Sequence, residues 1–418
     1  MLRLNSIPVS TFDASDVNDN QTVKLNSTDG VKTIYRKDIV ATGRLITCEY
    51  VGSYLNKNPN NKEKYNSMLD GKNTYKDLSR AHKEKKLLFC AAAVAEQEKT
   101  EAPASFEEFK RNAHVYAHNP TFLRVMAAID RDILSPIFFN VLDSVGMGLM
   151  QWDSTTFGAT KEINVRSNDA FLFEDSAWGS GHSTSKNYLY GKTITLTPKM
   201  FACNATIKWY QDVVNGDVGD YYAAIINGMY SKIYAKEMQA LTAAIDTYIP
   251  SGLKSATYTT QNWITITDLV AAANGVNVTD LIAVGQRTAL NNVVPIDGTG
   301  GAILGMSYGL GEKWFGNGFL PNVSGVDLLP VAPSIVPGTQ NSSLLTIGTG
   351  NNIYILAKGL YKPLYGVYME GTPIMLEATP GGDAGTADFT IDINVGATMD
   401  IKPVFASKVG VITSVYPS

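Results

Sequence analysis

One long amphipathic helix constrains this chain more than any other feature of its sequence. Between residues 218 and 245, apolar side chains recur every three to five positions, which is the spacing of one face of an α-helix. Asp217 and Asp220 suit the positive end of a helix dipole, and Pro250 ends the run. The pattern predicts a helix of about 28 residues. The side chains expected to pack along its buried face are Tyr222, Ile225, Met229, Ile233, Met238 and Leu241.

A long β-hairpin is expected shortly before this helix, over residues 158–200. Ile163 and Val165 alternate with polar residues, and Ile194 and Leu196 do the same after a stretch rich in Gly and Ser. Two stretches of period-2 alternation around a polar turn are typical of a hairpin. Two strands of this length cannot bury their own faces and are only marginally stable alone in water. The hairpin therefore predicts a partner surface, which we expect another copy of the same chain to supply.

The expected tip of the hairpin contains a near match to the nucleophile elbow of serine hydrolases. The sequence GHSTS at residues 181–185 differs from G-x-S-x-G at its last position. The residues before it are polar rather than a buried strand, and the residues after it are a poor helix start. A triad in the order Ser, Asp, His also needs a later histidine, and none follows His182. A hydrolase acting through Ser183 is therefore the remote alternative.

The preferred interpretation of the tip is a contact with a neighbouring subunit. Its small and hydroxyl residues supply a turn and adaptable hydrogen bonds, and its Trp supplies a large aromatic anchor. The expected contact residues are Trp178, Gly179, Ser180, Gly181, His182, Ser183 and Lys186.

The N-terminal region predicts an arm and then helices. Residues 1 to about 60 are polar, and we expect an extended arm that becomes ordered on a partner surface. A helix is expected from near Leu78, and Ser105 with Glu108 forms a capping box before another helix. Pro136 is expected to end the apolar helical stripe that follows.

The C-terminal half predicts a mixed lobe followed by strands. A short helix is expected to begin at Thr267 and to end at Gly275, and a buried strand is expected at 280–284 before a helix at 287–292. Loops rich in Gly follow, and alternation over 389–415 predicts closing strands. Helices and strands in this order indicate the α+β class.

The remaining motifs do not predict catalysis or metal binding. His114 and His118 have the i, i+4 spacing of a zinc pair, but the Glu of H-E-x-x-H and a nearby third ligand are missing. The Gly-rich stretch at 298–305 lacks the Gly-Lys-Ser/Thr end of a phosphate-binding loop. We therefore expect no catalytic residue, metal or cofactor. Two carboxylate pairs are expected on solvated faces or helix caps: Asp130 with Asp132, and Asp217 with Asp220.

Charge and cysteine content narrow the class of protein further. A net charge of −4 argues against a dedicated nucleic-acid-binding protein, which is usually basic. Three separated cysteines form no disulfide framework and are expected to be reduced thiols. The N-terminus lacks the apolar core of a signal peptide, and the apolar run at 87–95 is too short to cross a bilayer. A buried helix is expected there, and no membrane association.

The order of these expected elements resembles the major capsid proteins of tailed bacteriophages, the HK97-like family. The resemblance covers roughly residues 120–418 and is one of pattern, because the family has no invariant short motif. The stretches that carry it are TITLTPKMFACNATIKW at 193–209, the helix at 218–245, the helix-strand-helix at 267–292, GFLPNVSGVDLLPVAP at 318–333 and the strands at 389–415.

The resemblance implies a division of the chain into the parts of that fold. These are an N-terminal arm or extension with helices at 1–115, a helical part leading into the shell fold at 116–157, the extended hairpin or E-loop at 158–200, a peripheral domain with the spine helix at 201–255, an axial domain with Gly-rich loops at 256–355, and closing strands of the peripheral domain at 356–418.

The resemblance also implies a structural subunit without enzymatic activity. Such a subunit self-assembles into hexamers and pentamers of an icosahedral phage head that encloses double-stranded DNA without sequence-specific binding. The implied partners are further copies of the chain and scaffolding, portal and decoration proteins. The implied location is the virion, after assembly in the host bacterial cytoplasm. The alternative with the same fold is an encapsulin-like protein nanocompartment shell, and a tail-tube or surface-layer subunit is a further alternative.

Overall fold

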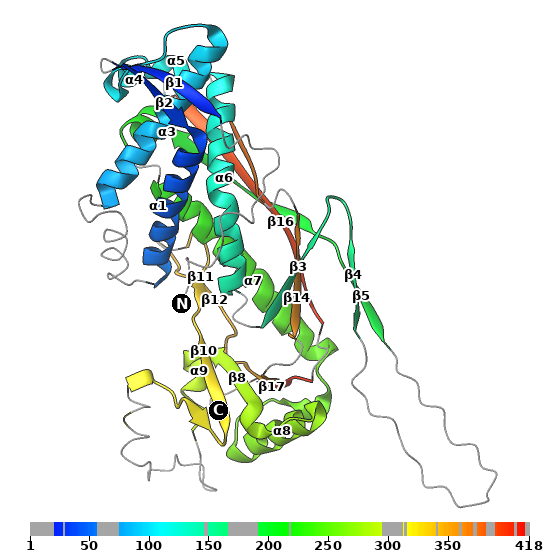
Figure 1. Ribbon diagram of the computed structural model, residues 1–418. Coiled ribbons are helices and arrows are strands. Elements are labelled where there is room, and N and C mark those ends of the chain that lie inside the picture. The colour runs from blue at the N-terminus through cyan, green and yellow to red at the C-terminus, as the bar shows by residue number, and fades with distance from the viewer. Residues whose placement is uncertain are drawn as a thin grey trace, which may run out of the picture. The chain divides into compact units, whose positions relative to one another are not determined.

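Runs of helices and runs of strands follow one another along the chain, which confirms the expected α+β class (Figure 1). The computed structural model describes residues 21–27, 30–56, 75–145, 149–165, 191–216, 219–294, 312, 316–339, 342–358, 362–370, 374–381, 389–404 and 408–413. The chain divides into two units. Unit 1 comprises Met1–Val145, Pro198–Tyr230 and Tyr368–Met399, and unit 2 comprises Gly146–Thr197, Ser231–Val367 and Asp400–Ser418.

Three long helices in contact with one another form most of unit 1 (Figure 1). They are α1 (Arg36–Asn56), α3 (Tyr75–Glu98) and α6 (Pro120–Val145). Their contact surface is apolar, and Ile39, Phe89 and Ile129 have 0–1% of their surface exposed. The short helices α4 (Phe106–Arg111) and α5 (Ala113–Tyr116) follow α3. Half of the expected capping box is present, because Ser105 Oγ accepts a hydrogen bond from the Glu108 N–H at 3.3 Å, whereas the Glu108 carboxylate accepts from the Ala104 N–H at 2.7 Å.

The expectation of an extended arm at the N-terminus is wrong for the residues that the structure describes there. Strands β1 (Thr22–Ser27) and β2 (Gly30–Tyr35) form an antiparallel hairpin, which α1 follows directly. Val23 and Leu25 are buried on one face of β1, and Ile46 is buried in α1. Although residues 21–56 are mostly polar, they contain short periodic runs of apolar residues. These apolar side chains are enough to pack β1 and α1 on the neighbouring helices. Residues 1–20 lie outside the described residues.

Helix α6 continues through Pro136 for a further nine residues, so the helix end expected there is wrong. A proline has no N–H to donate to the carbonyl four residues earlier, which here belongs to Asp132. Nε of Arg44, from α1, donates to that carbonyl at 3.0 Å instead. The buried side chains of Ile137, Phe138 and Val141 continue the apolar face beyond the proline. Packing and a replacement donor thus compensate for the missing helical hydrogen bond.

The carboxylates of Asp130 and Asp132 are buried in ion pairs, so the expected solvated face is also wrong. Asp130 accepts a hydrogen bond from Nζ of Lys86 at 3.0 Å, and that ammonium also donates to the Tyr222 hydroxyl at 2.7 Å. The Lys86 and Asp130 side chains are only 2% and 1% exposed. Asp132 binds the Arg36 guanidinium at 2.6 Å. The first cluster ties α3 and α6 to the start of the long helix that contains Tyr222.

The imidazole of His82 is a second buried polar group, and it lies where α1, α3 and α6 meet. A Cβ added at Gly43 would come within 2.6 Å of the His82 ring and of Ile133, so only glycine permits this approach. Both ring nitrogens of His82 are buried and have no hydrogen-bond partner. Burial, with a smaller effect of the neighbouring Lys86 and Lys85 charges, lowers the pKa of His82 to about 3. His82 is therefore a neutral core residue.

The sheet of unit 1 is antiparallel. Strand β16 (Thr390–Pro403), through its unit 1 residues, pairs with β15 (Ile374–Pro380) on one side and with β6 (Lys199–Lys208) on the other. Helix α6 packs on β15. The stretch at 193–209, which carries part of the resemblance, contains most of β5 (Lys192–Leu196) and all of β6, because Pro198 interrupts it and β6 pairs within unit 1.

The mixed sheet of unit 2 has six strands in the order β7-β17-β13-β8-β10-β9. Their bounds are Lys254–Ser255, Gly410–Ile412, Ile353–Ala357, Leu281–Gln286, Val326–Val331 and Asn322–Val323. The strand expected at 280–284 is thus confirmed as β8, and α9 (Arg287–Leu290) follows it. Unit 2 also contains β3 (Met150–Thr155), β14 (Leu364–Met369), mostly in this unit, and the two-stranded sheet of β11 (Ser334–Ile335) with β12 (Thr346–Ile347).

Helix α8 (Thr260–Asn274) packs on β13 and β17 of this sheet. It begins seven residues before the expected start, because the Thr259 side chain caps it by accepting from the Asn262 N–H at 3.0 Å. Gly275 ends it in the left-handed region, with φ of +65°, as expected. A Cβ at Gly410 of β17 would meet the side chains of Ile266 and Val270, so the helix lies directly over this glycine.

The expected long helix is present as α7 (Gly219–Thr247), with 29 residues. The division between the units falls within it, after Tyr230. All six side chains expected on its packed face are buried, with exposed fractions of 0–7%.

The carboxylate of Glu237 is also fully buried, and neither of its oxygens has a hydrogen-bond partner. This burial raises the pKa of Glu237 to about 8.

Replacing Lys86 with Met should destabilise unit 1 by about 3–5 kcal/mol, because Asp130 would stay buried without a counter-charge. The measurement is urea unfolding followed by tryptophan fluorescence and hydrogen exchange of α3. The double variant Lys86→Met/Asp130→Leu should recover much of the loss. Arg80→Met, which removes an exposed pair with Glu84, is the control and should cost less than about 1 kcal/mol. A Lys86→Met variant with the same free energy of unfolding as the wild type would contradict this account.

Glu237→Gln should remove a pH dependence of stability. Between the unfolded pKa of about 4.5 and the folded pKa of about 8, only the folded state keeps the proton. The wild-type free energy of unfolding should therefore fall by about 1.4 kcal/mol per pH unit from this group as the pH rises. The glutamine variant should be more stable than wild type at about pH 9 and closer to it at about pH 5.

Urea unfolding at both pH values measures this difference. Asp246→Asn is the matched control, because Asp246 lies on the same helix with its side chain 97% exposed. An equal loss of stability in Glu237→Gln at both pH values would show that the carboxylate does not titrate as described.

Candidate assembly surface

The base of the expected hairpin is a pair of antiparallel strands in unit 2 (Figure 1). They are β4 (Lys161–Val165) and β5 (Lys192–Leu196), with Ile163 opposite Ile194. Ile, Val and Leu alternate with polar residues such as Thr and Asn along both strands. Each strand therefore has one apolar and one polar face. Residues 166–191 connect the two strands.

The two faces of this hairpin base have different surroundings. The apolar face packs within unit 2, where Ile194 and Leu196 form a buried cluster with Val367 and Val404. The opposite face carries exposed polar side chains, and the Thr193 hydroxyl donates to Asn164 Oδ1 across the strands at 2.7 Å. The base is thus anchored on one side and open on the other.

Polar contacts fix the position of the base. The Thr197 N–H donates to Asp400 Oδ2 at 3.0 Å, and Nζ of Lys402 donates to the Thr195 carbonyl at 2.6 Å. On the other strand, Lys161 binds Asp153 at 2.7 Å, and this hydrogen bond lowers the pKa of the Asp153 carboxyl. Both strands of the hairpin base are therefore held to other parts of unit 2.

The residues expected at the tip lie outside the described residues. These are Trp178, Gly179, Ser180, Gly181, His182, Ser183 and Lys186. The structure therefore places the strands that present the tip, and the contact role of the tip stays a prediction. The same holds for the hydrolase alternative at Ser183 and for the Gly-rich stretch at 298–305.

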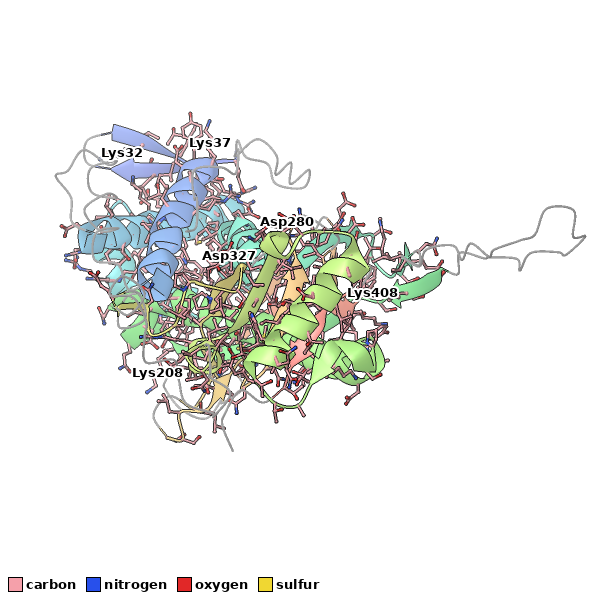
Figure 2. All side chains as sticks on the ribbon, turned by 90° about the horizontal axis from the view of Figure 1, so that it is seen from below. Lys32, Lys37, Lys208, Asp280, Asp327 and Lys408 are labelled. Carbon is pink, nitrogen blue, oxygen red and sulfur yellow. The ribbon has the colours of Figure 1, made fainter. Side chains whose placement is uncertain are left out.

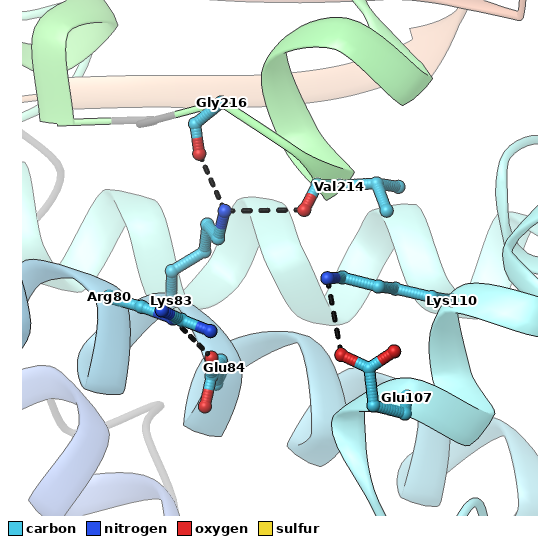
Figure 3. A network of polar contacts seen from close by, with 7 residues as sticks. All are labelled: Arg80, Lys83, Glu84, Glu107, Lys110, Val214 and Gly216. Carbon is cyan, nitrogen blue, oxygen red and sulfur yellow. Dashed lines mark hydrogen bonds and ion pairs between the residues drawn. The ribbon is translucent and has the colours of Figure 1, made fainter.

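The start of α7 is positioned by a lysine that the sequence analysis did not single out. A π-helical turn (Trp209–Val214) precedes α7, and Nζ of Lys83 donates to the carbonyls of Val214 at 3.3 Å and Gly216 at 2.5 Å (Figure 3). A cation at this end of a helical turn satisfies carbonyls that have no helical partner. At Gly216 a Cβ would meet the backbone of Gln211 and Asp212 at 2.7–2.9 Å, so glycine is required.

Charged side chains on unit 2 form local pairs. Asp280 and Asp327 lie close to each other (Figure 2), where Nζ of Lys358 binds the Asp327 carboxylate at 2.5 Å and the Lys358 N–H donates to the Asp280 carbonyl at 2.7 Å. In unit 1, the His118 ring of the considered zinc pair packs edge-on against Phe389, with 5.4 Å between ring centroids. Within the described ranges, no group of three or more His, Cys, Asp or Glu side chains is placed to hold a metal ion.

None of the described helices is both long enough and apolar enough to cross a bilayer.

No protein-family model matches the chain, and no curated protein matches it. Solved structures of phage capsids share part of its arrangement. The capsid structure of the cyanophage P-SCSP1u is 14% identical, covers 64% of this chain and 86% of its own, and has a TM-score of 0.38. The bacteriophage PhiM1 mature capsid is 12% identical, with coverage of 65% and 87% and a TM-score of 0.39. The capsid of the native GTA particle is 12% identical, with coverage of 64% and 89% and a TM-score of 0.41.

Proposed function

We propose that this chain is the structural subunit of a tailed-phage head. In this proposal it assembles into hexamers and pentamers, which close into an icosahedral shell around double-stranded DNA. It acts through its surfaces and has no catalytic residue or cofactor. Scaffolding, portal and decoration proteins are its partners, and it resides in the virion after assembly in the host bacterial cytoplasm.

The observation that supports the proposal most is the one-sided packing of the β4–β5 base. Two strands that are covered on one face gain little stability from each other. Residues 166–191 join the two strands, and in this proposal they contact a neighbouring subunit in a ring. A contact between different surfaces of identical subunits is heterologous, and such contacts close into rings of fixed number. Several extended contacts per subunit then act together, which raises the strength of the whole shell.

The order of the described elements also supports a shell subunit. A helical region is followed by the hairpin base, the long buried helix α7, a mixed sheet with α8, and a last long strand, β16, that pairs back with β6. This order resembles that of the HK97-like family. A net charge of −4 suits a wall around packed DNA, because a strongly cationic lining would bind the phosphates.

Sedimentation of the purified full-length chain tests the proposal. Particles far larger than a hexamer, without enzymatic activity, are the expected result. A chain that stays monomeric at every concentration would overturn it. The contents of shells recovered from the natural source separate the proposal from an encapsulin-like compartment, because a phage head holds DNA and a nanocompartment holds a cargo protein.

Trp178→Ala should weaken assembly, because the large aromatic side chain is the expected anchor of the hairpin tip on the neighbouring subunit. The measurement is the lowest protein concentration at which large particles sediment, and we expect an increase of about tenfold or more. Ser183→Ala, in the same segment, is the matched control and should assemble as wild type. Loss of a hydrolytic activity in Ser183→Ala, with unchanged assembly, would instead support the hydrolase alternative.

A further inference from the structure

The β11–β12 sheet exposes apolar side chains within a stretch of the sequence that contains no charged residue. From Leu328 to Ala357 the sequence contains no Asp, Glu, Lys or Arg. The exposed fractions of Ile335, Leu344 and Leu345 are 37%, 56% and 54%. We call these three side chains the β11–β12 patch. Exposed strand edges are normally protected by charged residues, especially Lys, and this protection is absent here.

The β11–β12 patch is held in place by hydrogen bonds. The Val336 N–H donates to the Leu345 carbonyl at 2.8 Å, and the Leu344 N–H donates to the Thr339 carbonyl at 2.8 Å. Ser231 of α7 binds the Ile335 carbonyl at 3.1 Å. The patch is therefore part of the framework of unit 2 and is presented in a fixed shape.

Leu344 has a backbone conformation that is unfavourable for its side chain. Its φ is +47°, in the left-handed region where non-glycine residues are uncommon. A glycine or asparagine would adopt this conformation at lower cost and would leave no apolar side chain in water. Strained residues of this kind concentrate at functional sites. A leucine that is both strained and exposed points to a contact that buries it.

The same unit presents an apolar side chain suited to such a contact. Phe157, in the turn between β3 and β4, is 78% exposed, the largest fraction among the exposed large hydrophobic side chains of the described residues. Residues 154–160 around it carry no charge. The turn is closed by a hydrogen bond from the Ala159 N–H to the Thr156 carbonyl at 3.1 Å. The nearest charges along the chain, Asp153 and Lys161, are paired with each other.

The two surfaces lie on different sides of unit 2. In Figure 1 the connection from β3 to β4 lies beside β4 and β5, whereas β11 and β12 lie on the opposite side of this unit. One copy of the chain therefore cannot bring the two together. Two copies placed head to tail can do so, and repetition of the contact leaves neither surface exposed in a closed ring.

We propose that Phe157 of one copy packs on the β11–β12 patch of the next copy. The contact joins an aromatic side chain to three aliphatic ones without burying any charge, which is the composition of the core of a stable interface. The inference rests on the proposed function, because it names one of the contacts by which the shell closes. It concerns described residues and is separate from the hairpin tip.

Disulfide trapping tests the contact in the assembled full-length chain. In a background with Cys48→Ser and Cys203→Ser, one preparation carries Phe157→Cys and another carries Leu345→Cys. After assembly of the mixture under mild oxidation, we expect a disulfide-linked dimer that contains one chain of each kind. Either preparation alone should give no such dimer. A Leu269→Cys preparation mixed with Phe157→Cys is the control, because Leu269 is 43% exposed on α8, outside the patch.

Serine substitutions give an independent measurement. Phe157→Ser and Leu344→Ser/Leu345→Ser should each raise the concentration needed for assembly by about tenfold or more, with the melting temperature of the unassembled chain kept. Leu269→Ser should assemble as wild type. If the wild type assembles but no mixed disulfide forms and the serine variants assemble normally, the contact is overturned and the proposed function stands. A wild-type chain that never assembles overturns both.

Discussion

The buried ammonium group of Lys86 is the interaction on which the organisation of unit 1 depends. A charge in this position is tolerated only when it is neutralised and hydrogen-bonded, and Asp130 and Tyr222 meet both needs. The three side chains come from α3, α6 and α7, so the cluster fixes where the long helix begins relative to the N-terminal helices. Lys83, one turn earlier in α3, binds the carbonyls just before α7 and acts on the same region. Helix α3 thus positions the start of α7 through two lysines that lie one turn apart.

Open surfaces of unit 2 are the basis of the proposed function. In unit 2 the hairpin base is packed on one face only. The side chains of the β11–β12 patch are apolar and exposed, and the Phe157 side chain is exposed to solvent. Each of these features costs stability in an isolated subunit, because apolar groups or unpaired strands face water. In the proposed shell, neighbouring copies of the chain cover these features. Surfaces that suit a neighbour favour the proposed subunit that works by assembly.

Much of the fold was predictable from local patterns in the sequence. Helix α7, the ends of the hairpin and the Gly275 cap follow from periodicity and from the conformational freedom of glycine, which depend on neighbouring residues only. Long-range compensation was not predictable. Pro136 remains inside α6 because Arg44, far away in sequence, supplies a donor. Asp130 is buried because Lys86 pairs with it, and no sequence spacing indicates that pair. Of the candidate site, the sequence indicated the hairpin, whereas the β11–β12 patch required exposed fractions and a positive φ.

The most direct test of the account is electron microscopy of the purified full-length chain at increasing protein concentration. The account predicts closed particles with icosahedral symmetry, built from rings of six and five subunits. A protein that remains a dispersed monomer under every condition in which it is folded would contradict the central claim.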